Sequence, residues 1–434
     1  MTSDSSPPKP SLWRHRDFLL LWSGGAVSDV GTAVSTLVLP LIAVRTLDAS
    51  VFQVALLTVM IRLPSLVLTL PAGVIVDRVR NRRMLMIWCD VGRMLAVGSI
   101  PLATVFGSVT MWQLALAALA IGTFRVFFDV ADQSYLPTLL TREQLVDGNG
   151  KLRASETLAD SLGPSLGAAL SGVFGAARAI SLDSITYAVS VLTLVLIRTP
   201  ETGREAVSGA PRVGFRAAMG EGLRFVFGDA ILRRIAACTA TANLAIGVVT
   251  SLEVVFLIRS VHSSPTQIGI VLGLGTLGGF AGSLMAHRLA QRVGTARIMW
   301  VALVVPAPLT FLIPLAWSGW GALVYGVGWA AFNASGAVYN TAQISYRQAM
   351  CPPELLGRVN ASIRWLIWST VPASALIGGG LATWLGLRPT LWIGATIMAL
   401  TGMWLVFSPL RGMRDIPIAT MRAGTTGAAG AATA

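Results

Sequence analysis

The sequence predicts an all-α polytopic membrane protein with twelve membrane-spanning helices in two six-helix pseudo-repeats. Three observations support this prediction. First, the chain of 434 residues is 54% hydrophobic and only 12% charged, about half the charged fraction of a soluble domain, and its mean hydropathy is +0.69. Second, apolar runs of roughly 20 residues, long enough to cross a ~30 Å hydrocarbon core, recur along the chain. Third, the two halves of the chain resemble each other.

About twelve apolar runs are long enough to span a bilayer. They lie near residues 18–43, 52–75, 84–106, 112–135, 154–175, 179–197, 235–258, 267–286, 298–317, 320–345, 362–385 and 389–408. The pairs 154–197 and 298–345 allow other divisions.

The runs divide the chain into five parts. We expect a cytoplasmic segment 1–17, a first bundle 18–198, a linker 199–234, a second bundle 235–410 and a disordered cytoplasmic tail 411–434. In the linker, Phe215, Met219, Leu223 and Phe227 recur every four residues. This spacing predicts an amphipathic helix that lies in the membrane interface.

The loops between the runs alternate in charge. Loops after even-numbered runs, together with both termini, contain most of the lysines and arginines, whereas the other loops contain little beyond Arg45, Arg178, Arg259 and Arg388. This asymmetry predicts that both termini lie in the cytoplasm and that the chain resides in the plasma (inner) membrane. The net charge of +13 therefore reflects orientation in the lipid bilayer, and we expect no nucleic-acid partner. The three cysteines form no CxxC pair, which argues against a metal site.

An internal repeat relates the halves. When the sequence is shifted by 211 residues, "ADQSYLPTLLTREQLVDGNGKLR" falls on "AQISYRQAMCPPELLGRVNASIR" without a gap. Tyr135 then falls on Tyr346, and further on Gly167 falls on Gly378. A parallel six-plus-six repeat is typical of transporters whose halves rock about a central site.

The stretch "GVIVDRVRNRRM" lies between the second and third predicted spans. Its order of Gly, Asp-Arg and a basic pair resembles the loop signature of the major facilitator superfamily, and the resemblance covers about residues 16–410. It implies a cytoplasmic gate made by Gly73, Asp77, Arg78, Arg82 and Arg83. Gly73 would let two helix backbones approach closely, and Asp77 would accept hydrogen bonds from a helix N-terminus or pair with an arginine. A plain topology anchor is the alternative. The second half has Gln291 or Ala286 where the aspartate would stand.

A second motif refines the resemblance. "LRASETLADSLGPSLGAAL" in the fifth span resembles the motif of antiporters and exporters, matching at Gly163, Pro164 and Gly167 and, two residues before the stretch, at Gly150. The small residues permit tight packing, and Pro164 removes a backbone hydrogen bond. In addition, "RDFLLLWSGGAVSDVG", "EGLRFVFGDAILRRI" and "ELLGRVNA" resemble the branch that contains enterobactin exporters and macrolide efflux proteins.

Ionisable side chains inside the spans are candidates for proton coupling, because each costs about 2.5–3.5 kcal/mol at mid-bilayer. Asp29, Arg62 and Arg125 fall about 10 to 13 residues from the cytoplasmic ends of their spans, which is nearly one depth at 1.5 Å per residue. We expect Asp29 to pair with Arg62 or Arg125, and its protonation to help drive the conformational switch. Closer to the cytoplasm lie four further acids, interpreted as a structural charge network with substrate binding as the alternative: Asp129, Asp132, Glu156 and Asp160.

Two further acids, Asp183 and Glu253, lie near the outer ends of their spans. We interpret both as side chains that reach interfacial water.

Aromatic and amide side chains are candidates for substrate contact. The tenth span is the most polar apart from charged residues, and it resembles a cavity-lining helix. The candidate cavity residues are Trp22, Asn243, Asn333, Asn340 and Gln343.

These features favour a secondary active transporter, and the sequence contains no GxxxxGK[ST] loop for ATP. We therefore expect no cofactor, with the proton gradient as the energy source. Only three histidines occur, in no ligand spacing, which argues against an enzyme. The leading hypothesis is a proton-coupled exporter (antiporter) of hydrophobic or amphiphilic small molecules such as drugs or macrolides. Export of a siderophore or another natural product, or import of a small solute, remain alternatives. Nothing requires more than a monomer.

Overall fold

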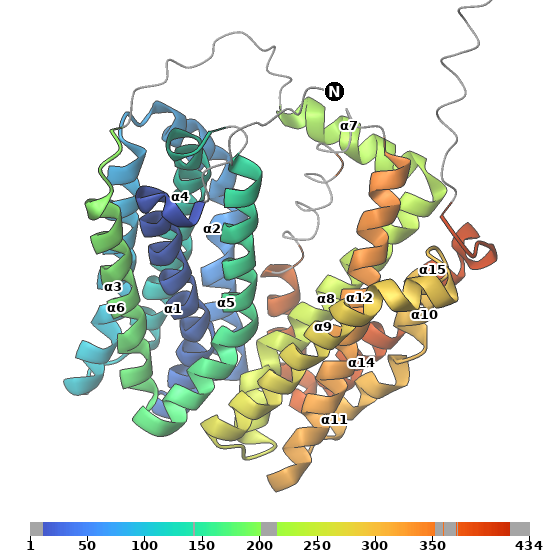
Figure 1. Cartoon of the computed structure of the whole chain (residues 1–434). Helices are drawn as coiled ribbons and strands as arrows, with labels where there is room; N and C mark the ends of the chain where they lie inside the picture. Colours follow the sequence, from blue (N-terminus) through green and yellow to red (C-terminus); the bar gives the residue numbers. More distant parts are fainter. Residues whose placement is uncertain are drawn as a thin grey trace, which may run out of the picture.

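A computed structural model describes residues 12–141, 144–200, 215–351, 359, 370 and 372–416. Within these residues the chain forms helices and connecting segments, with no strand. The helices form two bundles that stand side by side (Figure 1). All-helical architecture is therefore confirmed.

The first bundle contains six long helices. Its elements are η1 (Leu12–Arg14), α1 (Arg16–Thr46), α2 (Val51–Arg78), α3 (Arg82–Val105), α4 (Met111–Leu139), α5 (Leu145–Phe174) and α6 (Ala176–Leu196). Helix α1 packs against α5 and α6, α2 against α4, and α3 against α4 and α6.

The second bundle follows α7 (Phe215–Gly228). It consists of α8 (Ala230–Arg259), α9 (Pro265–Val293), α10 (Ile298–Val304), η2 (Ala307–Phe311), α11 (Leu312–Leu315), η3 (Gly319–Gly321), α12 (Ala322–Met350), helical residues 372–385, α14 (Leu387–Leu400), α15 (Met403–Val406) and η4 (Pro409–Gly412). Helix α9 packs against α12, and α8 packs against α14.

Nine helical segments among the described residues are long and apolar enough to cross a membrane. Helices α5 and α12 are equally long but carry more polar side chains, because they face the space between the bundles. The remaining predicted span, 362–385, is described only in part.

Serine caps start the second helix of each bundle. Ser50 and Gln53 form a capping box at the start of α2, and Ser264 and Gln267 form one at the start of α9. In each box the serine hydroxyl oxygen accepts a hydrogen bond from the backbone N–H of the glutamine, and the glutamine side chain accepts one from the backbone N–H of the serine. Two N–H groups that have no partner within the helix are thereby satisfied. These boxes fix where the chain turns back at the ends opposite α7.

The apolar segment 298–317 differs from the expected single span. Helix α10 ends at Val304, and a 3₁₀ turn and the short α11 follow. Pro306 and Pro308 have no N–H to donate, so the α-helical hydrogen bonds cannot continue through them. Hydropathy predicted the crossing but not this break.

Equivalent glycines show the internal repeat in three dimensions. A Cβ on Gly167 of α5 would lie 2.9 Å from the Val34 carbonyl oxygen of α1, and one on Gly378 would lie 3.1 Å from the Val248 carbonyl oxygen of α8. Each glycine thus lets the fifth helix of its bundle lie against the first. The paired tyrosines at 135 and 346 are both fully buried.

The chain between and after the bundles is partly described. A helix, α7, occupies the predicted amphipathic segment and runs along the side where the bundles separate (Figure 1). The prediction that disorder begins at residue 411 is wrong for residues 411–416. There the Arg414 carbonyl accepts hydrogen bonds from the N–H groups of Ala296 and Arg297, and Asp415 accepts one from the Thr295 N–H. Residues 417–434 lie outside the described part of the chain.

Candidate functional site

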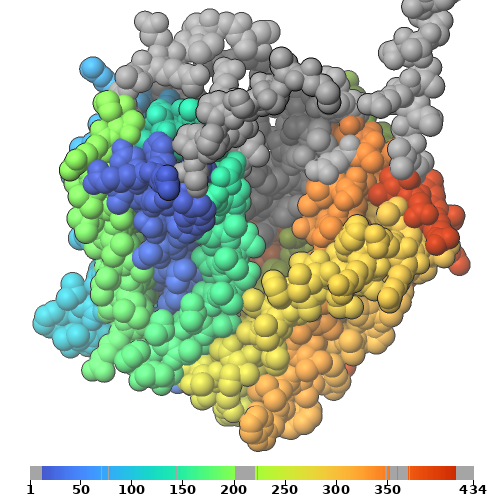
Figure 2. All heavy atoms as spheres, in the orientation of Figure 1, coloured from blue at the N-terminus to red at the C-terminus, as the bar shows by residue number. Residues whose placement is uncertain are grey.

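A large cavity lies between the bundles. Its volume is about 1420 Å³, and its walls come from α1, α2 and α5 of the first bundle and from α8, α9 and α12 of the second. The bundles are apart at the α7 end and meet at the other (Figure 2). Pockets for drug-sized ligands have volumes of about 300–1,000 Å³, so this cavity can hold a larger molecule.

Polar contacts hold the bundles together at the end opposite α7. The Arg259 Nη2 donates to the Asp48 Oδ1 at 2.6 Å and to the Ala49 carbonyl at 2.9 Å. The Arg45 guanidinium donates to the Ser263 carbonyl at 3.3 Å. All three contacts cross from one bundle to the other, so this end of the cavity is closed.

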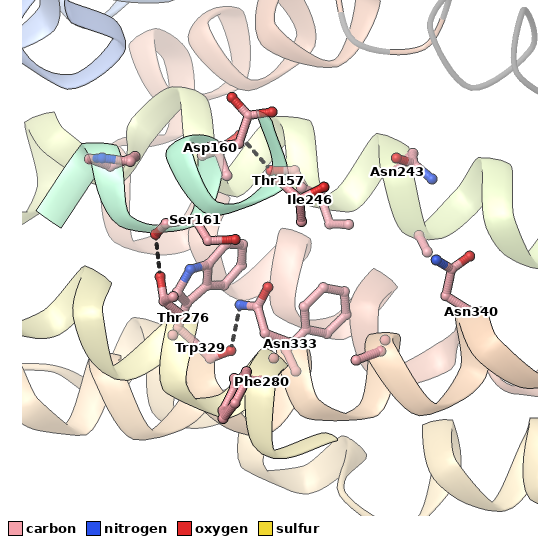
Figure 3. A pocket seen from close by; sticks show the side chains of 18 of the residues that line it. Thr157, Asp160, Ser161, Asn243, Ile246, Thr276, Phe280, Trp329, Asn333 and Asn340 are labelled. Carbon is pink, nitrogen blue, oxygen red and sulfur yellow. Dashed lines mark hydrogen bonds between the residues drawn. The ribbon is translucent and has the colours of Figure 1, made fainter. Parts of the chain in front are cut away.

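A second contact between bundles lies deeper. The Thr276 hydroxyl of α9 donates to the Ser161 carbonyl of α5 at 2.6 Å (Figure 3). The Ser161 carbonyl lies one residue away from Asp160, which lines the cavity. The contact between α5 and α9 therefore joins the cavity walls of the two bundles next to Asp160.

Arg125 is the centre of an ion cluster in the first bundle. Its Nη2 lies 3.5 Å from the Asp29 Oδ1 and 3.6 Å from the Glu156 Oε1, and its Nε lies 3.6 Å from the Asp129 Oδ2. Glu156 also pairs with Arg153 at 2.6 Å. The cluster ties α1, α4 and α5 together, and of the two partners expected for Asp29 the structure places Arg125 beside it.

The other predicted charges lie around this cluster. Arg62 and Asp160 line the cavity from α2 and α5. Asp132 lies on α4, one turn from the cluster, and the described residues form no ion pair with it. The cavity wall of the first bundle is thus charged next to the Arg125 cluster.

The second bundle contributes amides and aromatic rings. The cavity wall contains four amides that the sequence marked as candidates for substrate contact: Asn243, Asn333, Asn340 and Gln343. The amide of Asn333 donates to the Trp329 carbonyl at 2.8 Å, and that of Gln343 donates to the Asn340 Oδ1 at 2.8 Å. Figure 3 shows Asn243 and Asn340 facing the same space from α8 and α12.

Trp22 does not line this cavity, so the prediction of substrate contact is wrong for it. Its indole N–H donates to the Lys151 carbonyl at 3.3 Å, and its ring packs edge-on against Trp13 at 5.5 Å between centroids. The α1 face that carries Trp22 is turned toward the start of α5. Depth along α1 was predicted from sequence, but the direction of the side chain was not.

The residues of the implied gate lie in the last turns of α2 and the first turn of α3. Arg82 donates to the Ser134 carbonyl at 3.1 Å, and Arg83 donates to the Ile197 carbonyl, so both arginines bind carbonyls of their own bundle. Arg78 is the exposed last residue of α2, and the side chain of Asp77 lies outside the described residues. The prediction that Gly73 lets two helix backbones approach closely is wrong in this conformation, because a Cβ at this position would meet open space.

The fifth-span motif divides into two groups. A Cβ on Gly163 would lie 2.2 Å from the Ala33 Cβ of α1, and Gly167 approaches Val34 as described above, so these two glycines allow close packing. A Cβ on Gly150 would touch nothing within 4 Å, which contradicts a packing role for this glycine. Pro164 lies within an uninterrupted α5 and lines the cavity.

Sequence reasoning missed a buried polar network in the first bundle. Asp90 and Arg93 of α3 are 0% and 3% exposed and bind each other. The Ser190 hydroxyl of α6 donates to the Asp90 Oδ2 at 2.6 Å, and the Arg93 guanidinium lies 4.7 Å from the Tyr187 ring centre. Two opposite charges three residues apart in an apolar span were the signal that could have revealed this pair.

The interpretation of Asp183 and Glu253 as water-facing is also wrong. Asp183 is fully buried and accepts a hydrogen bond from the Ser35 hydroxyl. Glu253 is 8% exposed and lines the cavity from α8. Both residues lie near the helix ends as the sequence indicated, but neighbouring parts of the protein cover their side chains. No group of three or more His, Cys, Asp or Glu among the described residues is arranged to hold a metal ion.

Comparisons with known proteins agree with this architecture. The multidrug efflux pump Tap of Mycolicibacterium fortuitum is 26% identical over 422 residues, which cover 93% of this chain and 97% of that protein. Macrolide efflux protein A of Streptococcus pyogenes is 23% identical over 396 residues, 88% of this chain and 93% of that protein.

Solved structures share the fold. A bacterial homologue of the iron transporter ferroportin in its inward-facing state matches with a TM-score of 0.72 at 15% identity, over 92% of this chain and 99% of that one. The same homologue in its outward-facing state gives 0.52 at 16% identity, over 90% and 98%. The profile of the Major Facilitator Superfamily matches residues 21–375. The fold, the two related bundles and this match together show that the chain belongs to the Major Facilitator Superfamily.

Proposed function

We propose that this transporter is a proton-coupled exporter, an antiporter that moves hydrophobic or amphiphilic small molecules such as drugs or macrolides out of the cell. It works as a monomer by alternating access in the plasma membrane, with both termini in the cytoplasm. The observation that carries the proposal is the cavity of about 1420 Å³ between the bundles. Arg259 and Asp48 pair across one end of the cavity, and Arg62 and Asp160 provide charges in its wall near the Arg125 cluster.

The composition of the cavity wall supports an amphiphilic substrate. Leu37, Leu158, Ile246 and Phe280 offer apolar surface, and the amides described above offer hydrogen bonds. The named relatives are efflux proteins for multiple drugs and for macrolides. A large, mostly apolar cavity with few polar groups suits bulky compounds of this kind.

The direction of opening supports a cytoplasmic entrance. The structure resembles the inward-facing state of the ferroportin homologue more than its outward-facing state, with TM-scores of 0.72 and 0.52. The cavity opens toward α7, on the side where the arginine-rich loops lie. The charge asymmetry assigns this side to the cytoplasm, so both arguments point the same way.

The Arg125 cluster supplies a route for proton coupling. When a proton neutralises Asp29, Arg125 loses one of its three carboxylate partners and is drawn toward Asp129 and Glu156. Since Glu156 lies on α5, this change acts on the helix that holds the α5–α9 contact between the bundles. Protonation is thereby linked to the interface that must open and close.

Inverted membrane vesicles with an imposed pH gradient test this coupling. With an acidic lumen, the wild-type chain should accumulate substrates from a panel of antibiotics, dyes and siderophores. Asp29→Asn should lower gradient-driven uptake at least about tenfold, which corresponds to about 1.4 kcal/mol, while substrate binding persists. Asp147→Asn, which removes an exposed carboxylate at the start of α5, serves as the control. Undiminished uptake by Asp29→Asn would contradict the coupling role, and no uptake of any compound would contradict export of this class.

A further inference from the structure

A buried acid in the second bundle has no role in the coupling described above. Glu253 of α8 is 8% exposed, and its Oε1 has no hydrogen-bond partner within the described chain. The Tyr325 phenol of α12 lies beside this carboxylate and is fully buried. Glu253 is also part of the cavity wall, so it is buried from the bulk solvent but faces the space that holds the substrate.

The nearby cations do not neutralise Glu253. Arg259 lies six residues further along α8, about 9 Å along the axis, and pairs with Asp48 at 2.6 Å. Arg388 donates to the Ala316 carbonyl at 2.8 Å and lies over the Phe256 ring. Arg347 lines the cavity but is 22 residues from Tyr325 on α12, about 33 Å along the helix. The first bundle's charges at the cavity, Arg62 and Asp160, lie on the opposite wall.

Two aromatic rings share the cavity wall with the acid. Trp329 lies one turn from Tyr325 on α12, and it stacks on Phe332 with 5.8 Å between ring centroids and 16° between planes. Both rings line the cavity. A Cβ on Gly275 of α9 would lie 2.3 Å from the Trp329 Cδ1, so this glycine makes room for the ring and holds it in position.

We infer that Glu253 and the aromatic pair Trp329–Phe332 form a subsite that binds a positively charged organic group of the substrate, such as an amine or a quaternary ammonium. A buried carboxylate without a paired cation is costly even beside a phenol such as Tyr325, and an incoming cation compensates it. The face of a tryptophan ring attracts the same charge. With a single carboxylate, and no cluster of three metal-ligating side chains among the described residues, the subsite suits an organic cation better than a divalent metal ion.

The position of the subsite gives it a function in the cycle. Glu253 lies just inside the closed end of the cavity, about 9 Å along α8 from Arg259, which pairs with Asp48 at that end. A cationic head group bound there would leave the apolar part of the substrate along the wider cavity toward α7. The inference deepens the proposed export function by naming its substrate class, and it rests on that function for the identity of the cavity as the substrate site.

Binding of matched compounds to the purified full chain in lipid nanodiscs tests the subsite. The probes are a radiolabelled phenylalkyl trimethylammonium and its neutral isostere, in which carbon replaces the ammonium nitrogen. We expect the wild-type chain to bind the cation at least about tenfold more tightly. Glu253→Gln, which keeps the shape and removes the charge, should reduce this preference to less than about twofold. Asp183→Asn, which changes an equally buried acid outside the cavity, should preserve it.

Two further measurements keep the test decisive. Trp329→Leu keeps the apolar volume but removes the ring face, and should reduce the preference about threefold or more. If Glu253→Gln does not fold, the affinities of the wild-type chain for the two probes still test the inference. Equal affinity for the cation and its neutral isostere overturns it. Efflux from cells separates the two proposals. Export of both compounds without a charge preference refutes the subsite alone, whereas charge-selective binding without any export refutes the export function alone.

Discussion

At the scale of single residues, the charges of the first bundle form two separate systems. The side chains of the Arg125 cluster are partly exposed, and Glu156 directly precedes Thr157 of the cavity wall, whereas Asp90 and Arg93 are enclosed between α3 and α6. The Arg93 guanidinium also lies 4.5 Å from the Phe128 ring centre, which together with Asp90 compensates its burial. We propose that the first system changes with protonation and that the second holds helices together.

Breaking the enclosed pair should destabilise the protein. Asp90→Asn leaves the Arg93 charge buried without its carboxylate, which costs about 3–5 kcal/mol when one partner of a buried pair is removed. The double variant Asp90→Asn with Arg93→Met should recover much of this loss, because no charge then remains. Thermal unfolding of the purified variants measures both effects. A double variant less stable than Asp90→Asn would contradict this explanation.

The sequence predicted some residue positions and not others for a physical reason. Spacing from the helix ends gave the depth of Asp29 and Arg125, and at that depth the two side chains meet at 3.5 Å. Depth says nothing about the direction of a side chain around the helix. Trp22 was therefore placed in the cavity although it faces α5, and Glu253 was placed in interfacial water although it is 8% exposed and lines the cavity.

At the scale of helices, close packing depends on a few small residues. Helix α1 lies against α5 because Gly163 leaves room for Ala33 and Gly167 for Val34, and the arrangement at Gly167 recurs in the second bundle at Gly378. Apolar runs predicted the existence of these helices well, since a membrane span has a fixed minimum length. They did not predict the break after α10, which depends on where prolines remove hydrogen bonds.

Two substitutions in α5 should have opposite effects. Gly163→Leu forces side-chain atoms into Ala33, including its backbone at 3.0 Å, and should destabilise the bundle by at least about 1–3 kcal/mol. Gly150→Ala adds a methyl group in open space within the same helix, and should stabilise it by roughly 0.5–1 kcal/mol. The recovery of monodisperse protein after heating measures the difference. Equal tolerance of both changes would contradict the packing role of Gly163.

At the scale of the whole molecule, the two related bundles enclose a cavity that is closed at the end opposite α7. Among the described residues, the polar contacts between the bundles include those of Arg259 with Asp48 and Ala49, of Arg45 with Ser263, and of Thr276 with Ser161. Apolar side chains also pack between the bundles, because Leu41 and Ala168 belong to one buried cluster with Leu252 and Ile268. Two related bundles can exchange one closed end for the other by a rocking motion. We propose that this motion opens the cavity alternately to the two sides of the membrane.

Distances between spin labels on the two bundles test this claim most directly. One pair at Gly150 and Ser345 reports on the α7 end, and another pair at Val173 and Ile270 reports on the closed end; all four residues are exposed. On addition of substrate and acidification, we predict a population in which the first distance shortens while the second lengthens. Two distances that stay fixed, or that lengthen together, would contradict alternating access about this cavity.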